Sequence, residues 1–360
     1  MRLLDEANIE DIAIGAAVLG SGGGSDPYIG KLMAREAIRR YGPVQLYTLD
    51  ELADEDLVLP VAGMGAPTVL GEKLPAGDDI LRVYETLGKF IGRAPRATMS
   101  IEAGGMNSIR PIYIAARLGI PVVDCDGMGR AFPEIQMTVL TAHGISASPF
   151  VMSDERGNTL LINAISNRWV ETFSRSCVMH MGATCAIALY SARVAQLKHA
   201  AIQGTITLAE EIGATLRQAR LHEKNPVAAL CRFVAGFLLF RGKITDVDRR
   251  VVAGFARGKA SMSGSGDFAG QDLRLDFQNE HLVVRLDGRY IATTPDLIAV
   301  LDGETAKPIT TEGLRYGMRV AVIAIPCAPQ WREPAALALV HPRYFGYDID
   351  YIPVEERFHS

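Results

Sequence analysis

Apolar residues in the first half of the chain recur with two different periods, which predict alternating helices and strands. Spacings of three and four between Ile9 and Leu19 predict a helix with Asn8 as its candidate cap and an end at Gly20. A second helix is predicted from Pro27 to about residue 40, because an aspartate directly before a proline is typical of a helix start. The glycine-rich run at 20–24 should therefore join two helices.

The next hundred residues continue this alternation. Short apolar runs predict strands at 44–48, 57–62, 98–101 and 121–124, and helical periodicity predicts helices at 80–91 and 108–118. Strands that alternate with helices are typical of a sheet covered by helices. We therefore predict an α/β N-terminal domain with a parallel or mixed sheet.

The second half begins with helical patterns. Trp169, Phe173, Cys177 and Met181 stand four apart, which predicts an amphipathic helix, and Glu171 and Arg175 would form a pair on another face of it. Thr207 and Glu210 form a capping-box pattern that predicts a further helix up to the polar break at 221–225.

From about Leu239 onward, alternating segments are separated by turn residues. Asp287-Gly288 and Asp302-Gly303 are hairpin signals, and Gln278-Asn279-Glu280 can close another turn. The last third should be mainly β. We place the domain boundary near 164–167, which gives an N-terminal domain at 1–166 and a C-terminal domain at 167–360, although the helices at 165–220 could pack on either side.

Composition and charge narrow the class of protein. The 360 residues include 37 Lys and Arg against 41 Asp and Glu, a formal charge of −4, and the basic residues are scattered, which argues against a nucleic-acid partner. No apolar run could serve as a signal core or a membrane span. Five cysteines without a C-x-x-C pair argue against a disulfide framework or a thiolate zinc site. We expect a soluble cytoplasmic protein.

Three loops that follow predicted strands carry the candidate chemistry. They lie at 63–66, 102–107 and 124–130, and ligands of open α/β sheets bind beyond the carboxyl ends of strands. Glycines such as Gly63 would let a ligand approach the backbone. The polar groups of these loops are Glu102, Asn107, Asp124, Asp126 and Arg130. The loops should share one rim; the alternative is that their glycines only close tight turns.

The stretch from Asp124 to Glu134 concentrates acidic groups. Asp124 and Asp126, with one residue between them, are followed by Arg130 and Glu134. Paired acids can serve as a general acid and a general base, or can hold a divalent cation together with Glu134. Alternatively, the aspartates cap turns and Arg130 neutralises them. We predict no cofactor and leave a divalent metal open.

The glycine run before the second helix is a further candidate. Backbone N–H groups of Gly22, Gly23 and Gly24 at a helix N-terminus could bind an anion or a polarised carbonyl. Asp26 is a candidate ligand, but a helix cap is the more usual role of an aspartate there. The run is not a nucleotide fingerprint, because serine stands at position 25 and no strand is predicted before it.

Three stretches together resemble a known family. Residues 20–28 (GSGGGSDPY), residues 124–134 (DCDGMGRAFPE) and Thr294-Pro-Asp-Leu-Ile298 look like the S-methyl thiohydantoin desulfurase family. The pattern of that family carries a glycine where Ser25 stands and usually a small residue at Cys125, so we assign neither side chain a role. The resemblance implies an α/β domain followed by a β-rich domain, and an association with hydantoinase and oxoprolinase enzymes.

The resemblance also implies a reaction, in which water replaces the methylthio group of an S-methyl thiohydantoin to give a hydantoin and a thiol. We predict a hydrolase in which Asp124 or Asp126 deprotonates water. Glu102 or Glu134 would donate a proton, the N–H groups at 22–24 would stabilise charge on the ring carbonyl, and Arg130 would bind a substrate carboxylate.

Other functions use the same rim. The main alternative is a non-catalytic ligand-binding subunit that partners a hydantoinase-type enzyme, and a third is hydrolysis of an amide ring. The expected partners are a small-molecule substrate, with a homo-oligomer and a hydantoinase-type partner left open; neither nucleic acid nor a membrane is expected.

Overall fold

A computed structural model describes residues 1–66, 69, 73, 75–222, 225–252 and 254–358. The first helix, α1 (Glu6–Leu19), begins one turn earlier than expected: Asp5 is its cap, and the Asn8 side chain accepts a hydrogen bond from the Asp5 N–H over 2.7 Å. The other helices of this part are α2 (Tyr28–Tyr41), α4 (Asp78–Ile91), α5 (Gly105–Leu118) and the short α6 (Val139–Ala142). The predicted helices of the first half are therefore present.

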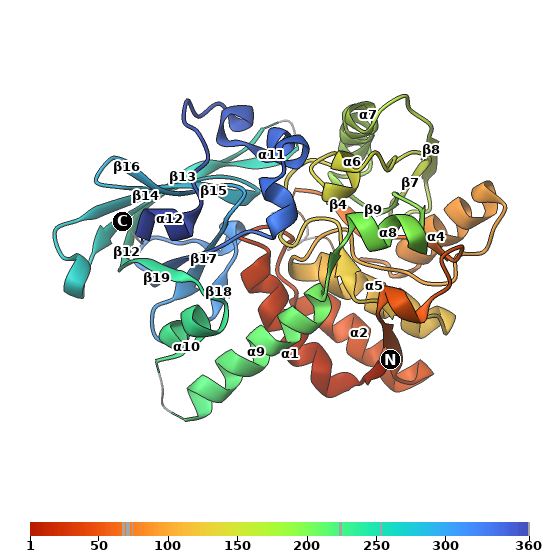
Figure 1. Cartoon of the computed structure of the whole chain (residues 1–360), viewed down its shortest axis with the longest axis horizontal. Helices are drawn as coiled ribbons and strands as arrows, with labels where there is room; N and C mark the ends of the chain where they lie inside the picture. The colour runs from red at the N-terminus through yellow and green to blue at the C-terminus, as the bar shows by residue number, and fades with distance from the viewer. Residues whose placement is uncertain (67–68, 70–72, 74, 223–224, 253, 359–360) are drawn as a thin grey trace.

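Two sheets form the framework of this part (Figure 1). One has the order β1 (Arg2–Leu4), β2 (Val44–Tyr47), β5 (Val122–Val123), with an antiparallel and a parallel pair. The other has the order β4 (Val61–Gly65), β9 (Thr184–Ala188), β7 (Phe150–Ser153), β8 (Thr159–Ile162) and is antiparallel. The expected α/β domain with a mixed sheet is confirmed.

Two of the predicted strands differ in detail. The run at 57–62 is divided at Pro60, which lacks an N–H for a ladder, into β3 (Leu57–Val58) and β4. Its first piece pairs with β10 (Ala192–Arg193). The run at 98–101 makes only single parallel bridges, such as Val61 with Ser100 and Thr98 with Val122, so it follows the strand path without a continuous ladder.

Residues 167–221 pack with the first part of the chain, which is one of the two arrangements that the sequence left open for them. Their helices are α7 (Asn167–His180), α8 (Val194–Ala200) and α9 (Thr205–Leu221). Strand β9 lies between β4 and β7, and α9 packs along α1 (Figure 1). A Cβ at Gly15 would lie 1.8 Å from the Ala209 carbonyl oxygen, so glycine permits this close helix crossing.

The C-terminal part is built on one antiparallel sheet of eight strands, which confirms the predicted β-rich domain. The order is β16-β15-β14-β13-β12-β19-β17-β18. The strands are β12 (Phe237–Val252), β13 (Phe255–Gly264), β14 (Asp272–Gln278), β15 (Glu280–Leu286), β16 (Arg289–Thr293), β17 (Leu297–Asp302), β18 (Pro308–Ile309) and β19 (Arg319–Ile325).

The turn signals of this part behave as expected at two positions. Asp287 and Gly288 have φ of 48° and 81° and join β15 to β16, which is the backbone that a tight hairpin requires. Asn279 has φ of 56° and turns the chain from β14 into β15. The helices α10 (Pro226–Phe233), α11 (Pro334–Val340) and α12 (Val354–Phe358) lie around the sheet (Figure 1).

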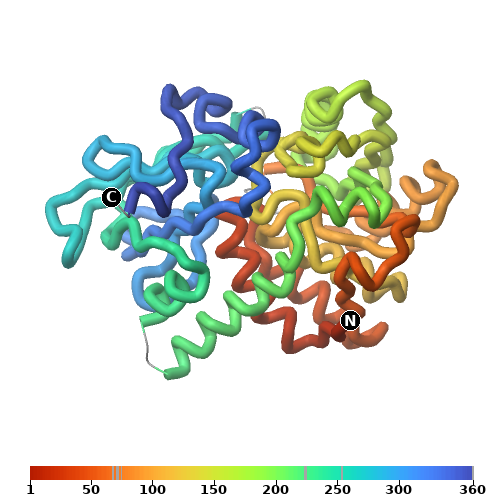
Figure 2. Tube along the Cα trace, viewed as in Figure 1, coloured from red at the N-terminus to blue at the C-terminus, as the bar shows by residue number. Residues whose placement is uncertain are grey.

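One hydrophobic core joins the two parts of the molecule. It includes Val18 and Met128 from the first part together with Leu297, Ile323 and Trp331 from the second. The Trp331 indole N–H donates to the Met128 carbonyl oxygen over 2.6 Å. The trace in Figure 2 shows the two parts side by side, with the chain ends far apart. Within the described residues, no helix combines the length and the apolar character needed to cross a membrane.

Candidate functional site

A cleft lies where both parts of the molecule meet. Its lining comes from Gly24 and Ser25, the end of β4 at 62–65, the start of α5 around Glu102 and Asn107, and the loop at 128–135. Arg175 on α7, the end of β9, and the β14–β15 turn at Asn279 and Glu280 complete it. Residues from all four segments that we expected to converge therefore line one cleft.

Glu102 is held in the cleft by a network that begins at the end of β4. The Asn107 side-chain oxygen accepts from the Gly63 N–H over 2.7 Å, which fixes the orientation of the amide. Its nitrogen then donates to Glu102 Oε1 over 2.6 Å and to the Gly63 carbonyl over 3.2 Å. Asn107 thus positions Glu102, and Gly63 serves as the anchor of both.

The environment of Glu102 suits proton transfer near neutral pH. Burial away from water raises the pKa of its carboxyl to about 7, although hydrogen bonds from Asn107 and the Phe132 backbone act in the opposite direction. A carboxyl group with a pKa near 7 can both take up and release a proton under physiological conditions. Glu102 is therefore the strongest acid–base candidate of the cleft.

A second buried carboxyl, Glu280, reaches the cleft from the C-terminal sheet. It is 3% exposed, and its Oε2 has no hydrogen-bond partner among the described residues. Burial, followed by the charge of Glu102, raises the pKa of Glu280 well above its usual range. The two carboxyls thus differ in surroundings, since donors stabilise the ionised form of Glu102 while Glu280 favours the protonated form.

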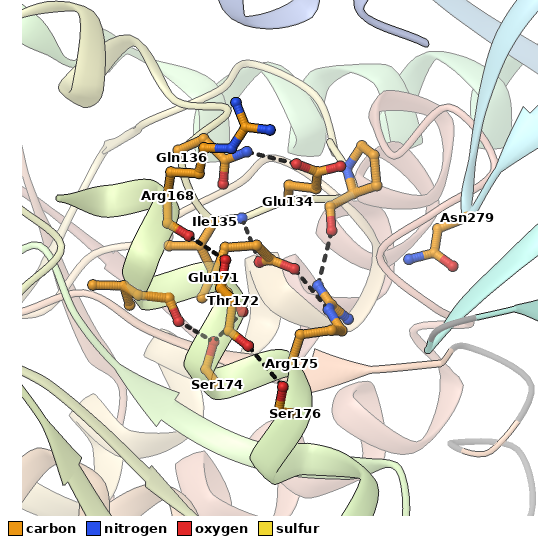
Figure 3. Close-up of polar contacts among 12 residues, drawn as sticks. Glu134, Ile135, Gln136, Arg168, Glu171, Thr172, Ser174, Arg175, Ser176 and Asn279 are labelled. Carbon is orange, nitrogen blue, oxygen red and sulfur yellow. Dashed lines mark hydrogen bonds and ion pairs between the residues drawn. The ribbon is translucent and has the colours of Figure 1, made fainter. Parts of the chain in front are cut away.

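Arg175 brings a positive charge to the cleft. Its Nε donates to Glu171 Oε1 over 2.7 Å (Figure 3). Its Nη2 donates to the Pro133 carbonyl over 3.1 Å, and the guanidinium lies over the Phe255 ring at 4.2 Å. No described residue accepts a hydrogen bond from its Nη1. The group is therefore rigidly held with one edge available to a ligand.

Asn279 lines the cleft from the side of the C-terminal sheet (Figure 3). Its side-chain oxygen accepts from the Ala256 N–H over 2.8 Å, which fixes the amide and leaves its nitrogen as a donor. Arg175 and Asn279 can therefore offer N–H donors to one ligand from two elements.

Glu134 lies nearer to solvent than the other two carboxyls of the cleft. Its Oε2 accepts from the Tyr344 hydroxyl over 2.7 Å and from the Gln136 amide over 2.5 Å. Burial and the neighbouring Glu134 raise the pKa of Tyr344 to about 12. Glu134 is half-buried and marks the mouth of the cleft.

The structure gives Asp124 a different use from the predicted one. Its Oδ1 accepts from the Ile206 N–H over 2.8 Å and from the Thr207 N–H over 3.2 Å, and the Thr207 hydroxyl donates to its Oδ2. Asp124 thus caps α9 from a distant segment, because Gly204 at the helix start has no side chain. We therefore withdraw Asp124 as a base; the Thr207–Glu210 capping box is also replaced by this contact.

Asp126 and Arg130 are likewise occupied within the protein. Both Asp126 oxygens accept from the Gly129 N–H, at 2.8 and 3.0 Å, and burial raises its pKa well above the usual range. The fully buried Arg130 guanidinium donates to the carbonyl oxygens of Ala131, Pro295, Asp296 and His281. We therefore withdraw Asp126 as the water-activating group and Arg130 as a carboxylate clamp: the first closes a turn and the second joins the two parts.

The glycine run supports the cleft mainly by its lack of side chains. A Cβ at Gly23 would lie 2.0 Å from Glu280 Oε1, and one at Gly22 would lie 2.4 Å from His281 Nε2. The Gly23 N–H donates to the Gly20 carbonyl over 2.8 Å, so it is not available to a ligand. The Gly24 carbonyl accepts from the Met106 N–H, which joins the run to α5.

Asp26 acts at the start of α2 rather than in the cleft. Its Oδ1 accepts from the Tyr28 N–H over 2.8 Å, and the residue is exposed. This is the helix-capping role that we considered the more usual one.

The comparison with protein families agrees with this architecture. A family model described as the S-Me-THD-like N-terminal domain matches residues 7–164, and the S-Me-THD-like C-terminal domain matches residues 165–354. The chain belongs to the S-Me-THD-like family. The two matches span nearly the whole sequence, as the resemblance of its motifs indicated.

A solved structure shares the fold of this S-Me-THD-like protein. It is a crystal structure of a protein from Chromobacterium violaceum, 23% identical, with a TM-score of 0.80, and the alignment covers 98% of this chain and 100% of that one. No curated protein matches the chain. At this identity the solved structure supports the fold alone.

The sequence analysis did not identify three residues of the cleft as site residues. Glu280 and Asn279 were assigned only to a turn, and Arg175 only to a helix-surface pair with Glu171. The signal that could have drawn attention to Glu280 is an acidic residue directly after a tight turn and before the apolar run of β15. Nothing in the local pattern shows that this turn reaches the other domain.

The described part of the chain contains no group of three or more His, Cys, Asp or Glu side chains placed to hold a metal ion. Of the thiols, Cys125 is fully buried, and burial followed by the charges of Asp126 and Asp124 raises its pKa well above the usual range.

Proposed function

We propose that this protein is a hydrolase of small cyclic amide-like substrates, with Glu102 as the base and Glu280 as the acid. The observation that supports this most directly is that two buried carboxyls from different domains line one cleft, where burial raises the pKa values of both and the charge of Glu102 raises that of Glu280 further. Such a pair can divide the roles of acid and base. Family membership suggests an S-methyl thiohydantoin as the substrate.

The proposed reaction can be written with this pair alone. Ionised Glu102 takes a proton from water, whose oxygen bonds to the ring carbon that bears the methylthio group, while protonated Glu280 donates to the adjacent ring nitrogen. The C–S bond then breaks, the thiolate takes the proton held by Glu102, and the hydroxyl proton returns to Glu280 as the carbonyl forms. The products are a hydantoin and methanethiol.

The other groups of the cleft would position the ring. Arg175 Nη1 and the Asn279 amide nitrogen would donate to a ring carbonyl oxygen, and removal of one such donor typically costs about 3 kcal/mol of transition-state stabilisation. Asn107 would hold Glu102 at a fixed distance from the end of β4. The apolar lining, which includes Met64, Met106 and Phe132, would take the methylthio group.

The test is to incubate the purified protein with S-methyl thiohydantoins and to measure thiol release with a chromogenic thiol reagent. Glu102→Gln and Glu280→Gln should each lower kcat by about a hundredfold or more. Glu211→Gln, an exposed position on α9, is the matched control and should keep the wild-type rate. Absence of thiol release from the wild-type protein would refute the proposed reaction.

Measurements of binding and of reaction products with the same substrates separate the alternatives. Binding of a hydantoin without turnover would favour a ligand-binding subunit that acts with a hydantoinase-type enzyme. Release of a new carboxylate without thiol would instead identify ring hydrolysis. In either case, mass spectrometry of the products distinguishes the outcomes.

A further inference from the structure

The charged groups of the cleft are unevenly balanced. Among the described residues that line it, Glu102, Glu134 and Glu280 carry carboxyls, and Arg175 carries a guanidinium. Arg175 already forms an ion pair with Glu171, at 2.7 Å. Glu171, and not one of the three cleft carboxyls, therefore compensates most of its charge. The cleft thus has an excess of acidic groups.

Glu134 is the member of this group that faces the entrance. Glu102 and Glu280 are 6% and 3% exposed, whereas Glu134 is half-buried. Tyr344 and Gln136 both donate to its Oε2, which holds the carboxylate in one orientation. Within the described part of the chain, no Lys, Arg or His lies within ion-pair distance of it.

The neighbouring arginines do not cancel this charge at short range. Arg175 is held by Glu171 and the Pro133 carbonyl. Arg168 lies on the same side as Gln136 in Figure 3, but it is exposed and does not lie within ion-pair distance of Glu134, so it offsets the charge of the carboxylate only in part. Glu134 therefore remains the fixed, unpaired charge at the mouth.

We propose that Glu134 is a specificity-determining residue, which selects cyclic substrates whose ring substituent carries a positive charge. The inference rests on the proposed function for its ring-binding cleft, but it concerns the substituent and not the reacting carbon. A ring that places its reacting carbon near Glu102 and Glu280 would direct its substituent outward, past Glu134. A basic group there would gain an ion pair, whereas an acidic group would be repelled.

The experiment measures binding, so that it does not depend on turnover. Calorimetric titration at low salt would compare the hydantoins derived from lysine and from norleucine, whose side chains differ by the terminal amino group. We expect the lysine-derived hydantoin to bind about fivefold more tightly, the range of a partly exposed ion pair. The glutamate-derived hydantoin should bind more weakly than the norleucine-derived one.

Three variants identify the residue responsible. Glu134→Gln, which still accepts from Tyr344, should reduce the ratio of the lysine-derived to the norleucine-derived affinity to about one. Tyr344→Phe removes a contact of Glu134 but keeps its charge, so it should retain the preference and serves as the control for a structural effect. Arg168→Gln removes an opposing charge and should increase the preference.

The outcomes are decisive in each direction. Equal binding of the two hydantoins by the wild-type protein, or an unchanged ratio in Glu134→Gln, would overturn the inference. A wild-type preference that Glu134→Gln abolishes, without any thiol release, would refute the proposed reaction and support the role of Glu134. Failure to bind any hydantoin would overturn both.

Discussion

At the scale of single residues, the chemistry of the cleft depends on how burial and hydrogen bonding act on similar carboxyls. Glu102, Glu280 and Glu134 have the same side chain, yet donors fix the first and third, while the second has an oxygen without a partner among the described residues. Water is excluded from the first two, which raises their pKa values. The position of each group, and not its type, therefore sets its proposed role.

The pH dependence follows from these shifts. Glu102 must be ionised to act as a base, so kcat/KM should rise with pH up to about 7 and fall about tenfold per pH unit below it. Glu280 must be protonated, and its raised pKa allows this at neutral pH, so the rate should fall again on the alkaline side. A pH–rate profile of thiol release checks this.

A profile that stays flat from pH 5 to about 8 would contradict the assignment of Glu102 as the base. Asn107→Asp provides a matched comparison, because it replaces the donor to Glu102 with a second acid. The acidic limb of its profile should move to higher pH, since a nearby negative charge disfavours ionisation of Glu102.

At the scale of elements, two aspartates that the sequence pattern suggested for catalysis instead accept hydrogen bonds from the backbone of a helix and a turn. Asp124 and Asp126 stand with one residue between them in a glycine-rich loop, which is equally typical of an active-site loop and of a loop that caps neighbouring backbone. The structure shows the second use, because Gly204 precedes α9 without a side chain and the first N–H groups of the helix need an acceptor.

Asp124→Ala should therefore affect stability more than rate. Loss of a helix cap typically costs about 1–2 kcal/mol in the free energy of unfolding. Urea denaturation monitored by circular dichroism measures this, and kcat should stay within about threefold of the wild type, far from the hundredfold loss expected for a base. A large loss of kcat in a stable variant would restore the original assignment of Asp124.

At the scale of the whole molecule, the cleft exists because the two parts share a core and exchange polar contacts. Arg130 from the first part donates to the carbonyl oxygens of His281, Pro295 and Asp296 in the second. Gly23 provides room for Glu280. The proposed acid therefore reaches the proposed base only when both parts are assembled.

Gly23→Ala tests this assembly directly. The added methyl group would overlap with Glu280 Oε1, a flexible side-chain end, so we expect a modest loss of stability and at least a tenfold loss of kcat. In the Glu280→Ala background the methyl group meets no carboxyl, and Gly23→Ala should then change the rate little further. Additive effects in this double-mutant cycle would show that the two residues act independently.

Arg130→Met tests the joint between the parts. It would leave four carbonyl oxygens without their charged donor in a fully buried place, which should cost about 3 kcal/mol or more in the free energy of unfolding. Arg96→Met, at an exposed position, is the control and should cost less than about 0.5 kcal/mol. Equal denaturation midpoints for the two variants would show that Arg130 does not stabilise the joint.

Sequence patterns were enough to predict the longer helices and the fold class. Periodicity located α1, α4, α5 and α7, because burial of one face of a helix imposes a pattern on neighbouring residues. Helix-start signals located α2 and α9, and alternating segments between turn residues predicted a β-rich second part. The sequence also indicated that the loops carrying Gly63, Glu102 and Asn107 converge, because strand ends of an α/β sheet meet at one edge.

The partners of each polar group were decided only by the tertiary structure. Asp124 contacts residues of a helix that lie 82 and 83 positions later in the chain, and Glu280 enters the cleft from a sheet that the sequence pattern places in another domain. Such contacts depend on how the two parts pack together. Packing between distant segments produces no periodic sequence pattern around a single acidic residue. The fold could thus be read from local physics, whereas the acid–base pair required the assembled molecule.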